Sequence, residues 1–410
     1  MDHFQIFKPR AVVLCVVALM GGQAQAGDTA LAHALGDVGF KLLRHQTQAA
    51  GTTGNAVVSP LSLGAALGLL QSGTSGATQS ELEHWVAGSS RRGQQFYATQ
   101  LPAWQSELQK TGAVTLANRL WVDATLTAAL QPRYADAVRT RYGAEPGSLV
   151  LTDPEQARTG INAWVSEQTR KQVPELLPAG ALSSASRLVV TNAVHFASRW
   201  EQPFDPLRTQ VRPFTLEGGG KVEARTMQAE REVRLAQVPA DQALVMELPF
   251  EGGTFSLLVA MPTSERPLGA FLERLKGADL TRWRSQLKPQ ACTLSLPRFE
   301  LLPSPQSLKA ALKASGVKTM FSHQANFTPM LTAAAAKGLH VENVFQSASL
   351  RVDEVGGVAA AATAAVVSVK SMPAPQPPCA VVDRPFVFAL IHQASGAPLF
   401  VGRVVNPAQN

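Results

Sequence analysis

A run of small, uncharged residues near the C-terminus places the strongest constraint on the fold. From Gly356 to Val369 the chain has no charged residue and almost nothing larger than valine. Lys370-Ser371 follows, and residues 372–378 then read Met-Pro-Ala-Pro-Gln-Pro-Pro. Each proline fixes its own φ and restricts its predecessor, so this stretch is expected to be extended. An alanine-rich helix followed by a linker is the alternative interpretation of the same composition.

The N-terminus has the features of a cleavable signal peptide. Lys8 and Arg10 precede an apolar run over residues 11–20, and the small-residue site Ala24-Gln25-Ala26 follows. We expect residues 1–26 to be removed, which leaves a single domain over 27–410. The apolar run is too short to cross a bilayer, and no later stretch reaches the roughly 20 apolar residues that a spanning helix needs. The mature protein is expected to be exported, extracellular or periplasmic, with no membrane anchor.

Composition limits the partners that the chain can have. Apolar residues make up 45% of it, enough for a large core. Cys292 and Cys379 cannot form a disulfide framework, and we expect two free thiols, with a disulfide between them as the alternative. The net charge is +7, but the basic residues are scattered apart from Arg91-Arg92. Weak association with polyanions is therefore the most that this charge predicts, with no specific nucleic-acid site and a monomeric state.

Local signals predict a mixed fold. Ser59-Pro60 joins a capping serine to a proline at the first helical position, and Gly73 can end that helix. Asp153-Pro154 repeats the start signal, and Pro174 ends the second helix. Apolar runs predict strands, two of them joined as a hairpin through Glu251-Gly252-Gly253, at residues 114–122, 187–196, 243–249, 254–261, 293–301 and 386–392. Their irregular order favours the α+β class without internal repeats.

One pair of residues fits an enzyme pattern. Ser315 and Lys318 have the Ser-x-x-Lys spacing of acyl-serine enzymes, but the Lys-Thr-Gly motif that accompanies it is missing. The sequence also lacks a His-Glu-x-x-His motif, a paired-cysteine metal site, a phosphate loop and a nucleophile elbow. His195 lies in an apolar strand and is interpreted as a core or sheet-face histidine. We expect no catalytic residue, no metal and no cofactor, with an acyl-serine hydrolase as the remote alternative.

Several longer segments resemble one known family in their order and spacing. They lie at residues 55–62 (Asn-Ala-Val-Val-Ser-Pro-Leu-Ser), 161–165, 174–177, 191–196 (Thr-Asn-Ala-Val-His-Phe), 200–204 (Trp-Glu-Gln-Pro-Phe), 384–388 and 398–407. Together they resemble the signature of the serpins, a family of serine protease inhibitors. The resemblance covers nearly all of residues 27–410. It implies a serpin fold with three β-sheets, about nine helices and an exposed reactive loop at about residues 355–384.

The resemblance also places the reactive bond. Glu354 stands where the family has the glutamate that closes the fifth strand of the main sheet. The family's scissile bond usually follows about sixteen residues later, which is between Lys370 and Ser371. Lys370 is the only basic residue between Arg351 and Arg384, so the expected target is a trypsin-like serine protease, held as a covalent acyl-enzyme complex.

In this family the cleaved loop inserts into the main sheet as a new central strand. Alternate side chains must then enter a close-packed interior, where an unpaired charge costs several kcal/mol. The hinge is expected at Glu354 and Gly356, and the inserted side chains are expected to be those of Gly357, Ala359, Ala361, Thr363, Ala365 and Val367. The absence of charge from residue 356 to 369 then has a kinetic reason, because insertion must outrun hydrolysis of the acyl-enzyme.

The sequence departs from the family at two positions. Gly357 stands where inhibitory serpins usually carry threonine or serine, which keeps a non-inhibitory serpin, acting as substrate, chaperone or carrier, as the alternative. Gln346 replaces a histidine that hydrogen-bonds beneath the sheet opening. Because glutamine also donates and accepts, the network that the family builds with the equivalents of Ser59, Ser62 and Asn192 is expected to persist without pH sensitivity. Trp200 is expected near the end of the main sheet where insertion begins.

Overall fold

The computed structural model describes residues 14–50, 54–150, 153–263, 266–301, 306–357 and 378–409. Side chains are described from Thr29 onward. Most of the predicted reactive loop therefore lies outside the described residues, including Lys370, Ser371 and the inward-facing set Ala359, Ala361, Thr363, Ala365 and Val367. The two ends of that loop, at Gly357 and Pro378, are described.

Six strands form the sheet that carries the candidate site. Its order is β10-β12-β4-β2-β3, with β11 paired to β12. The bounds are β2 Val114–Asp123, β3 Gly147–Leu149, β4 Leu188–Phe196, β10 Phe299–Leu301, β11 Gln306–Ser307 and β12 Asn343–Val352. β4 runs parallel to β12 and antiparallel to β2. The two long central neighbours therefore come from segments that are far apart in the sequence.

Nine strands form the second sheet, in the order β1-β15-β14-β8-β7-β6-β9-β13 with β5 paired to β6. The bounds are β1 Ala56–Val58, β5 Gln210–Thr215, β6 Lys221–Val238, β7 Ala243–Pro249, β8 Phe255–Pro262, β9 Lys288–Pro297, β13 Pro378–Val381, β14 Phe386–His392 and β15 Pro398–Val404. The long strand β6 pairs with β5, β7 and β9. Because β6 joins these strands into one hydrogen-bonded sheet, the described residues form two sheets where three were expected.

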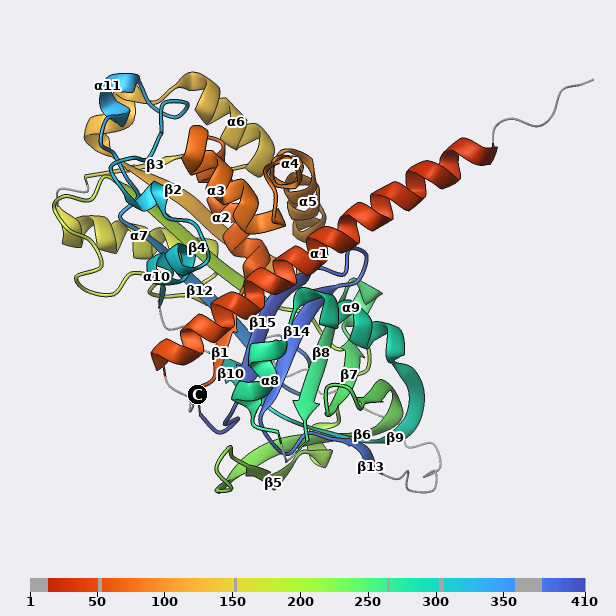
Figure 1. Cartoon of the computed structure of the whole chain (residues 1–410). Coiled ribbons are helices and arrows are strands. Elements are labelled where there is room, and N and C mark those ends of the chain that lie inside the picture. Colours follow the sequence, from red (N-terminus) through yellow and green to blue (C-terminus); the bar gives the residue numbers. More distant parts are fainter. Residues whose placement is uncertain are drawn as a thin grey trace, which may run out of the picture.

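Helices cover both faces of the six-stranded sheet (Figure 1). The described residues contain eleven α-helices, at α1 Leu14–Ala50, α2 Pro60–Gln71, α3 Gly76–Ala87, α4 Ser90–Gln95, α5 Leu101–Thr111, α6 Pro132–Tyr142, α7 Pro154–Gln168, α8 Leu268–Arg274, α9 Gly277–Gln286, α10 Lys309–Ala314 and α11 Ala333–Ala336. Strand alternation separates the faces. Val190 and Val194 of β4 belong to the large core that includes α2, whereas Val189 and Ala193 pack in a smaller cluster with α7. The α+β class is confirmed.

The local signals acted as predicted at several element boundaries. The Ser59 hydroxyl accepts the Ser62 N–H at 3.3 Å at the start of α2. The Asp153 carboxylate accepts the Gln156 N–H at 3.1 Å at the start of α7. β7 and β8 form the expected hairpin, and Gly252 in its turn has a φ of 77°, which favours glycine.

Helix α1 continues through the predicted cleavage site. Its C-terminal half packs against α9 and β15, with Leu35, Phe40 and Leu43 buried. Its N-terminal half extends away from the body of the molecule (Figure 1). Removal of residues 1–26 stays a prediction. In the described part of the chain, no helix has both the length and the apolar character needed to cross a bilayer.

The two cysteines after residue 27 are joined, which corrects the expectation of two free thiols. Cys292 in β9 and Cys379 in β13 form a disulfide with Cα atoms 5.7 Å apart. β13 runs parallel to β9, with Pro378 opposite Thr293 and Val381 opposite Ser295. The bond links positions 87 residues apart, so neither local sequence could indicate the pairing.

Candidate functional site

The candidate site is the seam between β4 and β12, together with the chain that leaves β12. The two strands are paired in parallel from Asn343 opposite Val189 to Ser349 opposite His195. Gln346 lies directly opposite Asn192 in this register. Because the pairing is non-covalent, an additional strand could enter here if the two strands separated.

Four buried polar residues that the family resemblance groups together meet beneath the middle of the seam. The Gln346 side-chain amide donates to the Asn192 Oδ1 atom at 2.6 Å, across the seam. The same amide donates to the Ser59 carbonyl at 3.2 Å, and its Oε1 atom accepts the Ser59 N–H at 3.4 Å. The Asn192 amide donates to the Ser62 hydroxyl at 2.6 Å. We call Ser59, Ser62, Asn192 and Gln346 the seam network.

The seam network ties both strands to the start of α2. Ser59 and Asn192 are fully buried, and Gln346 is 3% exposed. Asn192 also donates to Asn118 of β2, a contact that the sequence interpretation did not include. None of these five side chains titrates near neutral pH, so the glutamine at position 346 keeps the hydrogen bonds without a protonation switch. A buried polar group that loses its partner costs about 1–3 kcal/mol, so the network favours the closed seam.

Trp200 closes the end of the seam where β12 finishes. Its indole N–H donates to the Asp353 carbonyl, and its backbone N–H donates to the Val355 carbonyl, both at 2.8 Å. The indole stacks on Phe250 with the ring centroids 4.3 Å apart and an interplanar angle of 14°. Trp200 therefore holds the backbone of the segment Asp353–Gly357, which we call the hinge.

Two carboxylates of the hinge itself, those of Asp353 and Glu354, hold it in its conformation. The Glu354 side chain is buried, accepts the Thr209 hydroxyl at 2.6 Å and lies 3.5 Å from the Arg298 guanidinium. Asp353 accepts the N–H groups of Val355 and Gly356 at 2.9 and 3.2 Å, which folds the hinge into a tight turn. The sequence interpretation named Glu354 but missed Asp353. An aspartate shortly before a Gly-Gly pair is the local signal that could have indicated this turn.

The two hinge glycines lie against the end of β4. Gly356 has a φ of 146°, and a Cβ atom there would clash with the Ser198 carbonyl oxygen. Gly357 is buried, and its N–H donates to the same carbonyl at 2.8 Å. A Cβ atom on Gly357 would lie 3.2 Å from the Phe196 ring. Close packing against Phe196 of β4 therefore gives a physical reason for glycine at 357, one of the two positions where the sequence departs from the family.

His195 and Ser349 form a second side-chain contact across the seam. They are opposite one another in the register, and the His195 Nδ1 atom lies 3.1 Å from the Ser349 hydroxyl. His195 is a sheet-face histidine, as predicted. Burial lowers its pKa, and the nearby Arg170 charge lowers it further. The sequence interpretation did not pair it with Ser349, because only the strand register brings the two together.

Helix α7 lies over the opposite face of the seam from α2. Its Ile161 and Val165 pack with Val189 of β4 and Phe345 of β12 in the smaller hydrophobic cluster. This cluster therefore touches both sides of the seam. If the strands separated, α7 would have to move relative to at least one of them.

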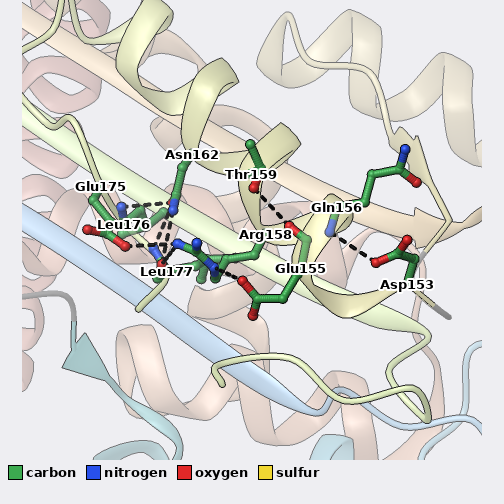
Figure 2. A network of polar contacts seen from close by, with 9 residues as sticks. All are labelled: Asp153, Glu155, Gln156, Arg158, Thr159, Asn162, Glu175, Leu176 and Leu177. Atoms are coloured by element: carbon green, nitrogen blue, oxygen red, sulfur yellow. Dashed lines mark hydrogen bonds and ion pairs between the residues drawn. The ribbon is translucent and has the colours of Figure 1, made fainter. Parts of the chain in front are cut away.

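Polar contacts fasten the segment after α7 back onto the helix (Figure 2). The Asn162 Oδ1 atom accepts the Leu176 and Leu177 N–H groups at 3.0 and 2.8 Å, and its amide donates to the Leu177 carbonyl at 3.0 Å. Arg158 contacts Glu175 at 2.9 Å. α7 and the segment that follows it therefore form one cover over the sheet.

The arrangement around Ser315 does not match an acyl-serine enzyme. The Ser315 hydroxyl donates to the Leu312 carbonyl at 3.0 Å and accepts the Trp85 indole N–H at 3.1 Å. The hydroxyl proton is thus directed to a backbone carbonyl, which is not a general base. Among the described residues, no cluster of three histidine, cysteine or acidic side chains could hold a metal ion.

Comparisons with known proteins agree over almost the whole chain. A family model described as Serpin (serine protease inhibitor) matches residues 33–407. Glia-derived nexin of Rattus norvegicus is 31% identical over 412 residues, which are 99% of each chain. Leukocyte elastase inhibitor of Sus scrofa is 30% identical over 86% of this chain and 93% of that protein. The crystal structure of native protease nexin-1 with heparin superposes with a TM-score of 0.79 at 28% identity, over 93% of this chain and 100% of that one.

Proposed function

The chain belongs to the serpin (serine protease inhibitor) family, and from this premise we propose that it is a single-use inhibitor of trypsin-like serine proteases. The family is described as serine protease inhibitors, and the chain is not an enzyme. In the proposed reaction the protease attacks the carbonyl of Lys370 and forms an acyl-enzyme, and Ser371 becomes a new N-terminus. The freed loop then enters the seam between β4 and β12 before water can hydrolyse the ester.

The observation that carries this proposal is the position of the hinge at the seam. Gly357 continues from β12, but its N–H donates to the carbonyl of Ser198, two residues after the end of β4. A strand that turned back from this point would run antiparallel to both β4 and β12. The charge-free segment 358–369 follows directly, so the residues that would enter the seam are those that a packed sheet can accept.

The free energy for trapping is proposed to come from the sheet itself. A new central strand of about a dozen residues makes backbone hydrogen bonds on both edges, which is worth on the order of 10 kcal/mol at about 1 kcal/mol for each bond. The seam network, the hinge contacts and the cover formed by α7 and the segment after it oppose this gain until the loop is cut. The intact protein is therefore metastable in this proposal.

Specificity is proposed to come from Lys370. A lysine at the bond fits the acidic primary pocket of trypsin-like proteases. The heparin in the protease nexin-1 structure belongs to that protein. For this chain we propose at most a weak polyanion association, because its basic residues are scattered.

We propose that the protein is exported after removal of residues 1–26. The N-terminal half of α1 extends beyond the body (Figure 1), so cleavage there leaves the buried part of the helix in place. The Cys292–Cys379 disulfide favours an oxidising compartment. Mass spectrometry of the exported protein would find a different N-terminus if residues 1–26 were retained.

Mixing the purified protein with trypsin tests the function. A denaturing gel should show a band at the summed mass of the two proteins. That band requires a gel without reductant, because Cys379 is bonded to Cys292 in the other fragment. With reductant the fragment that begins at Ser371 separates, and the complex band lies lower by the mass of that fragment. A clipped band without complex would mean that the protein is a substrate and would favour a non-inhibitory serpin, the alternative that Gly357 raises.

Two matched variants separate recognition from insertion. Thr363→Arg places a long cation at a predicted inward position and should convert the inhibitor into a substrate, because a buried unpaired charge slows insertion. Ala364→Arg, at the neighbouring outward position, should do much less harm. Equal inhibition by Thr363→Arg and the wild type would exclude insertion.

Lys370→Ala tests the reactive bond itself. It should abolish rapid trapping of trypsin while leaving the fold intact, because the variant loses only the side chain that the primary pocket binds. Trapping of trypsin at the wild-type rate, or a released fragment that does not begin at Ser371, would show that the reactive bond lies elsewhere.

A further inference from the structure

The disulfide fixes the far end of the reactive loop to the second sheet. Cys379 is the second residue of β13, and Cys292 lies in β9. β13 itself is a short strand at the end of the nine-stranded sheet, Pro378–Val381, and Pro378 has no N–H to donate. Without the disulfide, a few backbone hydrogen bonds and the packing of Ala380 in the large core would hold this strand.

The strand order shows where this anchor lies relative to the seam. β9 ends at Pro297, and β10 begins at Phe299, which is paired with Val352 beside the hinge. From there β10 runs into the six-stranded sheet, toward residues earlier in β12. Cys292 precedes this entry point. β9 and β13 lie beyond the end of the six-stranded sheet where β10 enters it (Figure 1). The disulfide between them therefore lies beyond the hinge, on the side opposite to the direction in which a strand would enter the seam.

The lengths of two chain segments determine how far an uncut loop can insert into the seam. A strand inserted from Gly357 to Lys370 would place Lys370 about 43 Å from the hinge. The chain from Lys370 to Cys379 spans at most about 31 Å when fully extended. With Cys379 held beyond the hinge, the uncut chain cannot return from the inserted position. Only cleavage of the loop would then allow full insertion.

Release of β13 changes this limit. Two contacts just after β13 must break as well, because the Val382 N–H donates to the Ser295 carbonyl at 2.9 Å and the Asp383 carbonyl accepts the Thr215 N–H at 2.8 Å. Once they break, the next fixed residue is Phe386 in β14, whose ring lies 5.7 Å from that of Phe299, also beside the hinge. The chain from Lys370 to Phe386 can span about 55 Å, which exceeds the 43 Å needed. An intact loop could then enter the seam completely while residues 378–383 leave β9 and β5.

From these distances we propose that the Cys292–Cys379 disulfide is a redox-controlled lock, which restricts loop insertion to the cleaved protein. Reduction removes the lock. The thiolate of a dithiol attacks the Cys379 sulfur, the S–S bond breaks, both cysteines become thiols and the dithiol closes into its own disulfide. Cys379 is only partly buried, whereas Cys292 is fully buried, so attack occurs at Cys379. The reduced inhibitor then inactivates without being cut.

The test compares oxidised wild type, wild type reduced with dithiothreitol and the variant Cys379→Ser. Each is incubated without protease, and samples are taken for melting temperature, intact mass and trypsin trapping. The reduced protein and the variant should convert to an uncut, heat-stable, inactive form at least about tenfold faster than the oxidised wild type. Val381→Thr, on the same strand with the disulfide retained, should behave as the oxidised wild type.

This inference depends on the proposed function, but the two can fail separately. If the oxidised wild type never traps trypsin, the proposed function fails, while melting temperature and mass still measure conversion without any protease. Equal conversion rates for Cys379→Ser and oxidised wild type would overturn the lock. Absence of conversion in both the variant and the reduced protein would also overturn it, because intact insertion would then not occur.

Discussion

The two contacts at the ends of the reactive loop are built in opposite ways. On one side, the seam between β4 and β12 is long, non-covalent and closed by buried polar side chains such as Asn192 and Gln346. On the other side, β13 is short but carries a covalent bond to β9. The molecule therefore places its reversible contacts where a strand is expected to enter and its covalent contact where the chain is expected to stay.

Cutting the loop should produce the largest change in stability, because the cut loop can then enter the seam. Cleavage near Ala364 by a protease that is not trapped frees a strand that can complete the six-stranded sheet. We expect a gain on the order of 10 kcal/mol and a rise in melting temperature of at least about 10 °C. Calorimetry before and after cleavage measures it. An unchanged melting curve would mean that the seam does not accept the loop.

Removing the disulfide should have the next largest effect on stability, and it should lower the stability. Removing a disulfide that links positions 87 residues apart should lower the free energy of unfolding by up to about 4 kcal/mol, because the unfolded chain gains freedom. Urea unfolding of freshly prepared Cys379→Ser measures this loss, with Val381→Thr as the control. A variant as stable as the oxidised wild type would show that β13 is held by its backbone contacts.

The seam network should contribute less to the stability of the folded protein than the disulfide does. Gln346→Ala leaves the side-chain Oδ1 atom of Asn192 and the Ser59 N–H without their partner. This should lower the free energy of unfolding by roughly 2–3 kcal/mol and speed polymer formation on mild heating. Gln346→His should recover much of this loss, because an imidazole also donates and accepts. Melting temperature and native gels compare the variants. If alanine and histidine behave alike, hydrogen bonding at 346 does not hold the seam closed.

The smallest effect should be a pH dependence from the His195–Ser349 contact. Burial lowers the pKa of His195 in the folded protein below its usual 6.5, so the unfolded state binds the proton more readily. Stability should therefore be complete above about pH 7 and fall as the pH decreases below 6.5. His195→Gln, which keeps a polar side chain without titration, should flatten the melting temperature over this range. A slope that persists in this variant would assign the pH dependence to another group.

Sequence patterns predicted those parts of the fold that depend on neighbouring residues. The cap at Ser59, the cap at Asp153 and the hairpin at Gly252 all formed as expected. The strand over residues 386–392 has the predicted bounds. In each of these cases the determining interactions lie within a few residues along the chain.

Features that depend on strand pairing were missed. The disulfide requires the parallel register of β13 and β9, and the His195–Ser349 contact requires that of β12 and β4. The seam network was an exception, because the family resemblance supplied the pairing. Asp353 was missed although its signal, an aspartate shortly before a Gly-Gly pair, was local.

The division of the hydrophobic interior into two unequal parts has a consequence for motion. The cluster that includes Ile161, Val165 and Phe345 is small, whereas the large core includes most of the nine-stranded sheet. Free energies of local opening follow the amount of packed apolar contact. Helix α7 should therefore open in sub-global fluctuations, and its amide hydrogens should exchange with solvent well before those of β7 and β8. The cover over the seam could then lift many times during the life of a folded molecule without the large core ever unfolding.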